Sequence, residues 1–338
     1  MSCSGNGSYV DGRETVEFGS YPQARVTDNA TISDLDAAAG ALPTTSDDGT
    51  WTDYGYYRNE SVVKIMWFKD VEYNNAKYRG VHMVSYRPRE TRLGKSTLST
   101  VQDNNGYLLT KDADGNYVPK TFWFKYEPIK WVVLDTKETG EKLLNATIGL
   151  DAQDFHHTAK NGDNNYANSF IRGWMNNDFY NAAFTAEDQA KVLTTEVDNS
   201  KSSTSDFDIE LTDYGCENTN DKVFLLSFQE LMKYMPTNDS RVRYCSEYAK
   251  CQGAFADGMI SDSDLYEEAK STDESAEEES EEEEEDVTIV GATEWWLRSP
   301  SPSKTTYNVW RVRSTGAFDL KTTIHTEYSI LPAIWLAA

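Results

Sequence analysis

The sequence predicts an α+β fold, and three observations support this. Segments of strand type, rich in aromatic and β-branched residues, lie at both ends of the chain, at residues 15–23 and 295–336. Segments with helical spacing of apolar residues lie between them, after residue 168. The last 44 residues contain four of the nine tryptophans, Trp295, Trp296, Trp310 and Trp335. We therefore expect mixed, mostly antiparallel sheets with two to three helices in the middle of the chain and a buried C-terminal end.

The first half of the chain contains most of the predicted strands. Thr15–Gln23 is expected to form a strand that stops at Pro22, and residues 71–78 to form a hairpin with Asn74-Asn75 at its turn. Residues 122–134 are the densest apolar run, so we expect a central strand there. Residues 142–147 follow a Thr139-Gly140 turn and are its expected partner.

The predicted helices begin at residues that can cap them. Asn168 or Ser169 can cap the first, in which Phe170, Ile171, Trp174 and Met175 share one face. Thr185 to Asp188 resemble a capping box, so we expect the helix to begin again there. Ser227 and Glu230 form a capping box for the next helix, after a short buried strand at 223–226. A last short helix at 246–252 is expected to end at Gly253.

The C-terminal stretch predicts several short strands. The first, from Trp295, should stop near Arg298 because Pro300 and Pro302 follow. Residues 307–312 alternate, with Tyr307, Val309 and Arg311 on one face. Gly316 is the expected position of a positive φ in the next turn. Residues 317–320 would return as a strand, and residues 330–336 form the last one.

Four sequence tracts carry a resemblance to a known family. They are Phe-Gly-Ser-Tyr-Pro-Gln at 18–23, Phe-Lys-Tyr-Glu-Pro-Ile-Lys-Trp at 124–131, Trp-Trp-Leu-Arg-Ser-Pro at 295–300 and Pro-Ala-Ile-Trp-Leu at 332–336. In these tracts the chain resembles a family of unknown function found in secreted and surface proteins of mostly Gram-positive, gut-type bacteria. The resemblance implies a C-type-lectin-like fold, related to formylglycine-generating enzymes and to the variable proteins of diversity-generating retroelements. Family members usually end Gly-Val-Arg-Pro-Ala, and here Ser329-Ile330-Leu331 replaces the first three residues.

The domain organisation follows from composition and from the spread of these tracts. We expect a flexible tail at 1–13 and a single C-type-lectin-like domain at 14–338, with a polar surface insertion at 28–50. A second insertion, 261–286, has 15 acidic residues against one lysine and is expected to be disordered. The net charge of −24 and the lack of a basic patch argue against nucleic acid as a partner.

The chain gives few signs of a membrane segment, a cofactor or disulfide bonds. No apolar run approaches the length of a membrane span, so we expect none. The resemblance implies an extracellular or cell-surface location, although the chain shows no signal sequence. No cofactor is implied. Cys245 and Cys251 could not pair within one helix, whereas a disulfide between Cys216 and either of them stays open.

The candidate ligand-binding residues lie in the C-terminal stretch: Arg298, Tyr307, Asn308, Trp310 and Arg311. Exposed Trp, Tyr and Arg supply much of the energy of interfaces, and tryptophan rings stack on sugar faces. Arg298 could read a ligand carboxylate, but a structural pairing with Glu127 or Glu294 is the favoured interpretation. Core packing is the favoured role of Trp295, Trp296 and Trp335.

An enzyme is the alternative, with His156, His157 and nearby acids such as Asp151, Asp154 and Asp163 in a cleft. The histidine spacing matches no zinc pattern, and no Gly-x-Ser-x-Gly elbow is present. Residues 252–338 contain no cysteine, which formylglycine-generating enzymes need, and the Glu-Pro-Asn and Trp-Asn-Asp calcium signatures of lectins are missing.

The sequence thus predicts a non-catalytic domain that binds a glycan or a protein, without a metal site. A buried polar cluster with a perturbed acid would argue against this prediction and for an enzyme. A diversified receptor of the retroelement type is a third possibility, because Ser, Thr, Tyr and Asn crowd positions 299–329.

Overall fold

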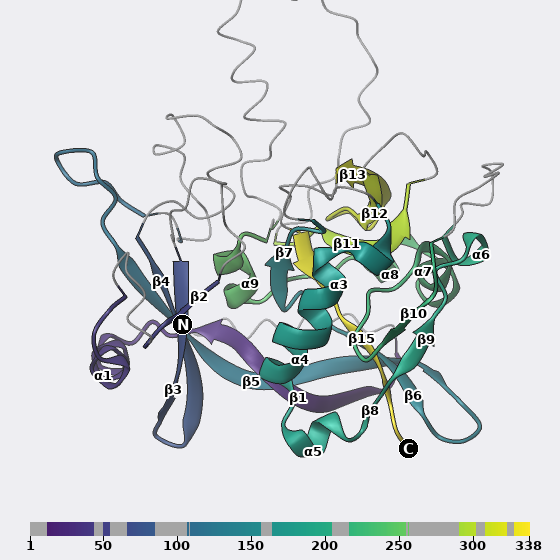
Figure 1. Cartoon of the computed structure of the whole chain (residues 1–338), viewed down its shortest axis with the longest axis horizontal. Helices are drawn as coiled ribbons and strands as arrows, with labels where there is room; N and C mark the ends of the chain where they lie inside the picture. The colour runs from purple at the N-terminus through teal and green to yellow at the C-terminus, as the bar shows by residue number, and fades with distance from the viewer. Residues whose placement is uncertain are drawn as a thin grey trace, which may run out of the picture.

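The computed structural model describes residues 12–43, 50–54, 66–84, 107, 109–156, 164–204, 216–254, 256, 291–301, 308–322 and 328–338. Within these residues the chain combines short helices with mostly antiparallel sheets, as the α+β prediction requires (Figure 1). No helix in the described ranges has both the length and the apolar character needed to cross a membrane.

An eight-stranded sheet runs the length of the molecule (Figure 1). Its strands are β1 (Thr15–Arg25), β2 (Thr52–Asp53), β3 (Met66–Tyr73), β4 (Ala76–Met83), β5 (Lys120–Thr136), β6 (Lys142–Ala146), β8 (Val192–Leu193) and β15 (Ala333–Leu336). The predicted central strand is β5, which pairs antiparallel with β1, β4 and β6. The C-terminal β15 pairs with β6, so the first and last strands belong to one sheet.

The second sheet has five strands in the order β13-β12-β11-β14-β7. Their bounds are β7 (Asp151–Gln153), β11 (Trp295–Pro300), β12 (Asn308–Val312), β13 (Phe318–Thr322) and β14 (Tyr328–Ile330). The β11–β14 pair is parallel and the other pairs are antiparallel. A small pair, β9 (Thr195–Val197) and β10 (Thr219–Asp221), lies apart from both sheets.

More helices are present than the two to three expected, because several of them are single turns. They are α1 (Asn29–Ala39), η3 (Tyr166–Asn168), α3 (Phe170–Trp174), the π-helical η4 (Met175–Phe179), α4 (Tyr180–Ala183), α5 (Ala186–Gln189), α6 (Lys201–Thr204), α7 (Phe228–Tyr234), α8 (Asn238–Arg241) and α9 (Glu247–Gln252). The expected caps are confirmed: Ser169 caps α3, and Thr185 and Ser227 form capping boxes. Gly253 ends α9 with a φ of 108°.

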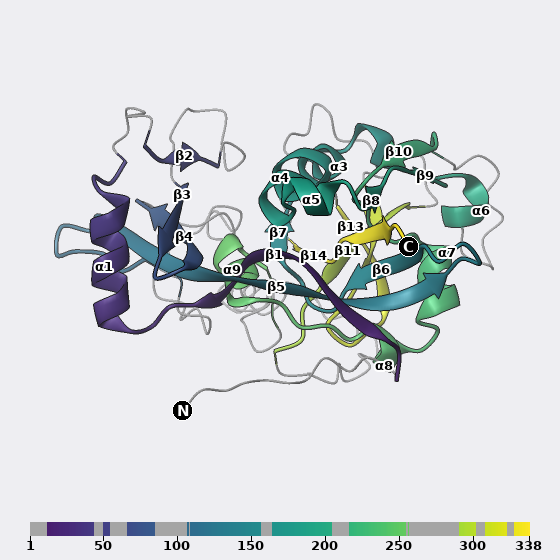
Figure 2. The same ribbon diagram turned by 90° about the horizontal axis from the view of Figure 1, so that it is seen from below.

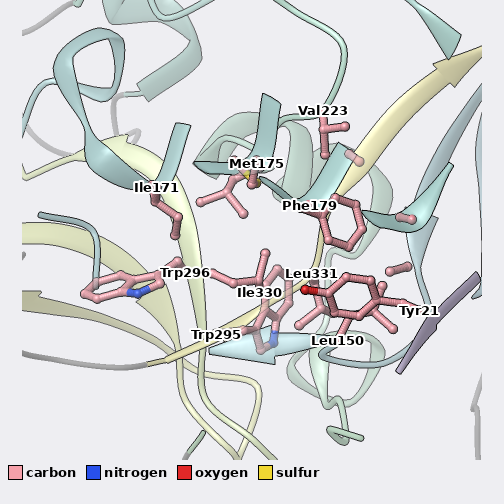
Figure 3. Packing of buried hydrophobic residues seen from close by; sticks show 14 of the residues in the cluster. Tyr21, Leu150, Ile171, Met175, Phe179, Val223, Trp295, Trp296, Ile330 and Leu331 are labelled. Carbon is pink, nitrogen blue, oxygen red and sulfur yellow. The ribbon is translucent and has the colours of Figure 1, made fainter. Parts of the chain in front are cut away.

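The main apolar core lies between the two sheets and the helices. Tyr21, Leu150, Trp295, Ile330 and Leu331 are packed together in it (Figure 3). Trp295 and Trp296 are fully buried, as predicted, whereas Trp335 is only half-buried. A separate cluster forms where α1 covers β3 and β4 at one end of the long sheet (Figure 2). Its buried members are Leu35, Ala39, Trp51, Trp67, Val71 and Trp123.

Several predicted boundaries were wrong. β1 continues through Pro22 because the pairing register shifts between Pro22 and Ala24, which tolerates the missing N–H. The region 28–50, expected to be a surface insertion, contains α1, which Asp28 caps and which buries Leu35. Residues 223–226 form only a β-bridge, between Phe224 and Ala333.

The C-terminal boundaries also differ. β11 extends to Pro300, with an irregular register after Trp296, and Pro332 divides the expected last strand into β14 and β15. The turn prediction at Gly316 is confirmed, with a φ of 81°. Cys216, Cys245 and Cys251 are all thiols, so neither of the disulfides left open for Cys216 forms. The acidic insertion 261–286 and the tail to residue 11 lie outside the described residues.

Candidate functional site

Four of the five predicted ligand-binding residues lie in two neighbouring strands of the five-stranded sheet. Arg298 lies in β11, and Asn308, Trp310 and Arg311 lie in β12. Tyr307 is outside the described residues. The described four differ sharply in burial: both arginines are buried, whereas Asn308 and Trp310 are half-buried.

The Arg298 guanidinium is enclosed and fully engaged. Only 1% of the residue is exposed. Its N–H groups donate to the Glu230 carboxylate, to the carbonyl oxygens of Leu225 (2.6 Å) and Asp198 (3.0 Å), and to Oδ1 of Asn199 (3.0 Å). Arg298 is thus paired with an acid, as predicted, but this acid is Glu230, the capping-box residue of α7, and neither of the two examples, Glu127 and Glu294. Arg298 joins β11 to α7, which is the structural role that the sequence favours.

Arg311 is held in the same way by two carboxylates. It pairs with Glu294 and Asp319 and donates to the Tyr328 hydroxyl at 2.8 Å. Burial lowers the pKa of Arg311, but the carboxylate of Glu294 and the other partners outweigh it, and the net shift of the pKa is upward. Arg311 therefore stays charged and paired within the sheet.

Asn308 and Trp310 lie on the opposite side of β12 from Arg311, because side chains alternate along a strand. The Trp310 ring packs against Phe228 of α7 and Phe318 of β13, with centroid distances of 5.0 and 6.2 Å. Phe228 is buried beneath the other two rings, which are half-buried. We call the group Asn308, Trp310, Phe318 and Phe228 the aromatic face.

A cation that the sequence analysis did not single out lies under this face. The Arg241 guanidinium carbon is 4.2 Å from the centre of the Phe318 ring. Its N–H groups donate to the carbonyl oxygens of Gly316 (2.7 Å) and Met235 (2.9 Å) and to the Asn238 side chain. Phe228 was missed as well, although its position directly after the Ser227 cap was the available signal.

Described residues that flank the two candidate sites of the sequence analysis are hydrogen-bonded to one another at Asn308. Nδ2 of Asn164, which follows the His156-His157 loop, donates to the carbonyl oxygen of Asn308 at 3.2 Å. The backbone N–H of Ser301 donates to the same oxygen at 2.8 Å. His156 is 2% exposed. His157 and Asp163 lie outside the described residues.

A second polar cluster lies deeper, between β1, β4, β7 and α9. The Asp151 carboxylate accepts hydrogen bonds from the Tyr21 hydroxyl (2.6 Å), the Ala152 N–H (2.7 Å) and Nε2 of Gln153 (3.3 Å). Burial raises the pKa of Asp151 to about 7. Arg79 lies close enough to lower that pKa, while it pairs with both oxygens of Asp70.

This second cluster contains an acid, Asp151, whose pKa is shifted, and such an acid would favour an enzyme. It is closed to solvent, however, since Tyr21 and Asp151 are at most 2% exposed. The Tyr248 hydroxyl, which accepts a 3.5 Å hydrogen bond from Nη1 of Arg79, belongs to a fully buried side chain. In the part of the chain that the structure describes, no group of three or more His, Cys, Asp or Glu residues could hold a metal ion.

The protein-family model of a domain of unknown function, DUF6273, matches residues 139–338 of the sequence. The chain belongs to the DUF6273 family. The DUF6273 region contains β11 to β15, the aromatic face and Asp151, whereas Tyr21 and Arg79 precede it. No curated protein matches the chain, and no solved structure does.

Proposed function

We propose that this DUF6273 protein is a non-catalytic ligand-binding domain, with a C-type-lectin-like core, of a bacterial secreted or cell-surface protein. Its ligand is a glycan or a protein surface. The observation that carries the proposal is the aromatic face, where Trp310 and Phe318 are half-buried on a rigid sheet beside Asn308. Partly exposed aromatic rings on a fixed support lose little conformational entropy when they bind.

The arrangement of the chain supports the lectin-like core. β1 and β15, at opposite ends of the chain, belong to one sheet, and all the described helices except α1 lie between β7 and β11 in the sequence (Figure 1). The termini of the lectin-like fold meet in the same manner. The loop ends at Asn164 and Asn308 converge at one end of the second sheet, which is where a scaffold of this type presents binding residues.

A binding screen of the purified chain tests the proposal. It would use a glycan array and a panel of bacterial and host surface proteins, each with and without calcium. We expect binding that does not need calcium and that a Trp310→Ala variant loses. Tyr117→Ala is the matched control, because Tyr117 is also half-buried but precedes β5. Loss of binding in both folded variants, or in neither, would contradict the proposed site.

The Asp151 cluster favours a second candidate function, an enzyme that uses a buried acid. The Asp151 carboxyl has a pKa of about 7, which suits a general acid or base. Such an enzyme would need an opening of the structure that admits substrate to Asp151. Hydrolase assays on the wild type and on Asp151→Asn test this: turnover that Asp151→Asn abolishes would replace the binding proposal, and its absence leaves the cluster a structural one.

A further inference from the structure

The charges around the aromatic face restrict the chemistry of its ligand. The arginines of β11 and β12 are Arg298 and Arg311, and both are buried and paired with carboxylates. Arg241 of α8 is 3% exposed, and carbonyl oxygens and an amide hold its guanidinium beneath Phe318. A guanidinium recognises a ligand carboxylate, sulfate or phosphate by directing two parallel N–H groups at it. None of these three can do so without leaving its present partners.

The nearby carboxylates are committed in the same way. Glu230 pairs with Arg298, while Glu294 and Asp319 pair with Arg311. A cationic ligand would have to compete with these arginines for its partner. Taking a carboxylate away from its arginine would leave a buried guanidinium uncompensated, which disfavours the exchange. These three arginines and three carboxylates, all among the described residues, are therefore engaged already and offer the face no site for an anion or a cation.

The groups that the face does present are uncharged. Trp310 and Phe318 have half-buried rings, and the amide side chain of Asn308 lies on the same side of β12 as Trp310. Ring faces pack against the C–H surface of a ligand, and an amide both donates to and accepts from hydroxyl groups. A pyranose ring combines these two features, because its C–H bonds form one face and its hydroxyls surround the edge.

The field of the whole chain acts in the same direction. The net charge of the chain is −24. Such a charge repels an approaching anion over roughly a Debye length, about 8 Å at physiological ionic strength. We infer that the aromatic face binds a neutral glycan, and that it rejects sialylated, sulfated or phosphorylated glycans and acidic peptides. This inference rests on the proposed binding function and specifies its ligand.

The test compares neutral oligosaccharides of hexoses and N-acetylhexosamines with their sialylated and sulfated counterparts. Titration calorimetry of the full chain would measure Kd for each at ionic strengths of about 0.05 M and about 0.5 M. We expect neutral ligands to bind with a Kd that changes less than about twofold between these salts, because screening affects only charged pairs. Trp310→Ala and Asn308→Ala should each weaken binding by about tenfold or more.

Two further variants keep the result interpretable. Trp310→Phe preserves packing on Phe228 and should retain part of the affinity. Asn116→Ala, in the exposed turn between Lys111 and Tyr117 and outside both sheets, should leave Kd unchanged. Thermal unfolding of each variant shows whether the fold is retained.

The outcomes separate this inference from the proposed function. Preferential binding of an acidic glycan, or a Kd that rises steeply with salt, overturns the neutral-glycan inference while the binding function stands. A protein ligand whose binding depends on Trp310 also overturns the neutral-glycan inference and leaves the binding function standing. No ligand of any class, or binding that Trp310→Ala leaves untouched, overturns the proposed function itself.

Discussion

The Tyr21 hydroxyl donates a 2.6 Å hydrogen bond to Oδ2 of Asp151, and this contact joins β1 of the long sheet to β7 of the five-stranded sheet. Tyr21 lies outside the DUF6273 match, whereas Asp151 lies inside it. Arg79 of β4, also outside the match, acts on the same carboxylate. The segment that precedes the matched region is therefore part of the polar core of that region and not an appendage.

The ionisation of Asp151 makes stability depend on pH. Its folded-state pKa is about 7, against about 3.9 for an unperturbed aspartate. A raised folded pKa contributes stability that is fully present below the unfolded value and is lost as the pH rises through the folded value. We predict that the melting temperature of the wild type, relative to Asp151→Asn, falls between pH about 5 and about 8. Calorimetric unfolding at a series of pH values measures this difference.

Asp135→Asn is the control for that experiment. The hydrogen bond from the Tyr234 hydroxyl, together with that from Lys233, lowers the pKa of Asp135. A lowered pKa contributes stability that is lost only as the pH falls through that value. The difference in melting temperature between the wild type and Asp135→Asn should therefore stay flat between pH about 5 and about 8. A flat difference for Asp151→Asn as well would refute the assigned role of Asp151.

Tyr21→Phe tests the hydrogen bond itself. When Asp151 is ionised, this variant removes a donor from a buried carboxylate, which costs about 1–3 kcal/mol. When Asp151 is protonated, the cost should be smaller, because a neutral acid depends less on that donor. We expect the loss of unfolding free energy in urea to be greater at pH about 8 than at pH about 5. An equal loss at both would mean that Tyr21 contributes through packing alone.

Much of the fold was predictable because short-range rules determine it. The capping boxes at Ser227 and Thr185 and the turn at Asn74-Asn75 depend on neighbours within four residues. The errors arose where contacts with residues distant in sequence determine the local structure. Pro22 stays in β1 because the pairing with β5 shifts register, and α1 forms in a polar stretch because β3 supplies an apolar surface for Leu35.

The candidate site was predicted less well, for a similar reason. Trp310 and Asn308 share a strand face, which alternation predicts. Arg298 and Arg311 resemble ligand residues in the sequence, but their acids lie 68 and 17 residues before them and are found only in the fold. Asp151 was noted only as an acid near two histidines, since the burial that raises its pKa comes from strands and a helix far away in sequence.

Arg298 should be essential for stability. Arg298→Met removes a charge that Glu230 and two backbone carbonyls need, and breaking a buried pair from one side costs about 3–5 kcal/mol. Arg298→Lys should recover little, because an ammonium cannot reach four acceptors in different directions. Urea unfolding measures both. The double variant Arg298→Met/Glu230→Met should regain part of the loss, and a cost below about 1 kcal/mol for Arg298→Met would place this pair among the weak ones.

Gly316 and Gly115 form a matched pair for the last prediction. Both have positive φ, 81° and 84°, so an alanine at either position is strained by about 1 kcal/mol. The two glycines differ in the room that their surroundings leave for a Cβ atom. A Cβ on Gly316 would lie 2.0 Å from the carbonyl oxygen of Asn238, whereas one on Gly115 would meet nothing within 4 Å.

Because the atom that Gly316 would meet is backbone, the turn after β12 or the start of α8 must move to admit an alanine. That movement would disturb Arg241, which donates to the Gly316 carbonyl and supports Phe318. We predict that Gly316→Ala costs at least about 2 kcal/mol more than Gly115→Ala in chemical unfolding. It should also weaken ligand binding at the aromatic face, which Gly115→Ala leaves intact. Equal costs for the two variants would mean that the turn after β12 and α8 do not pack as closely as this geometry requires.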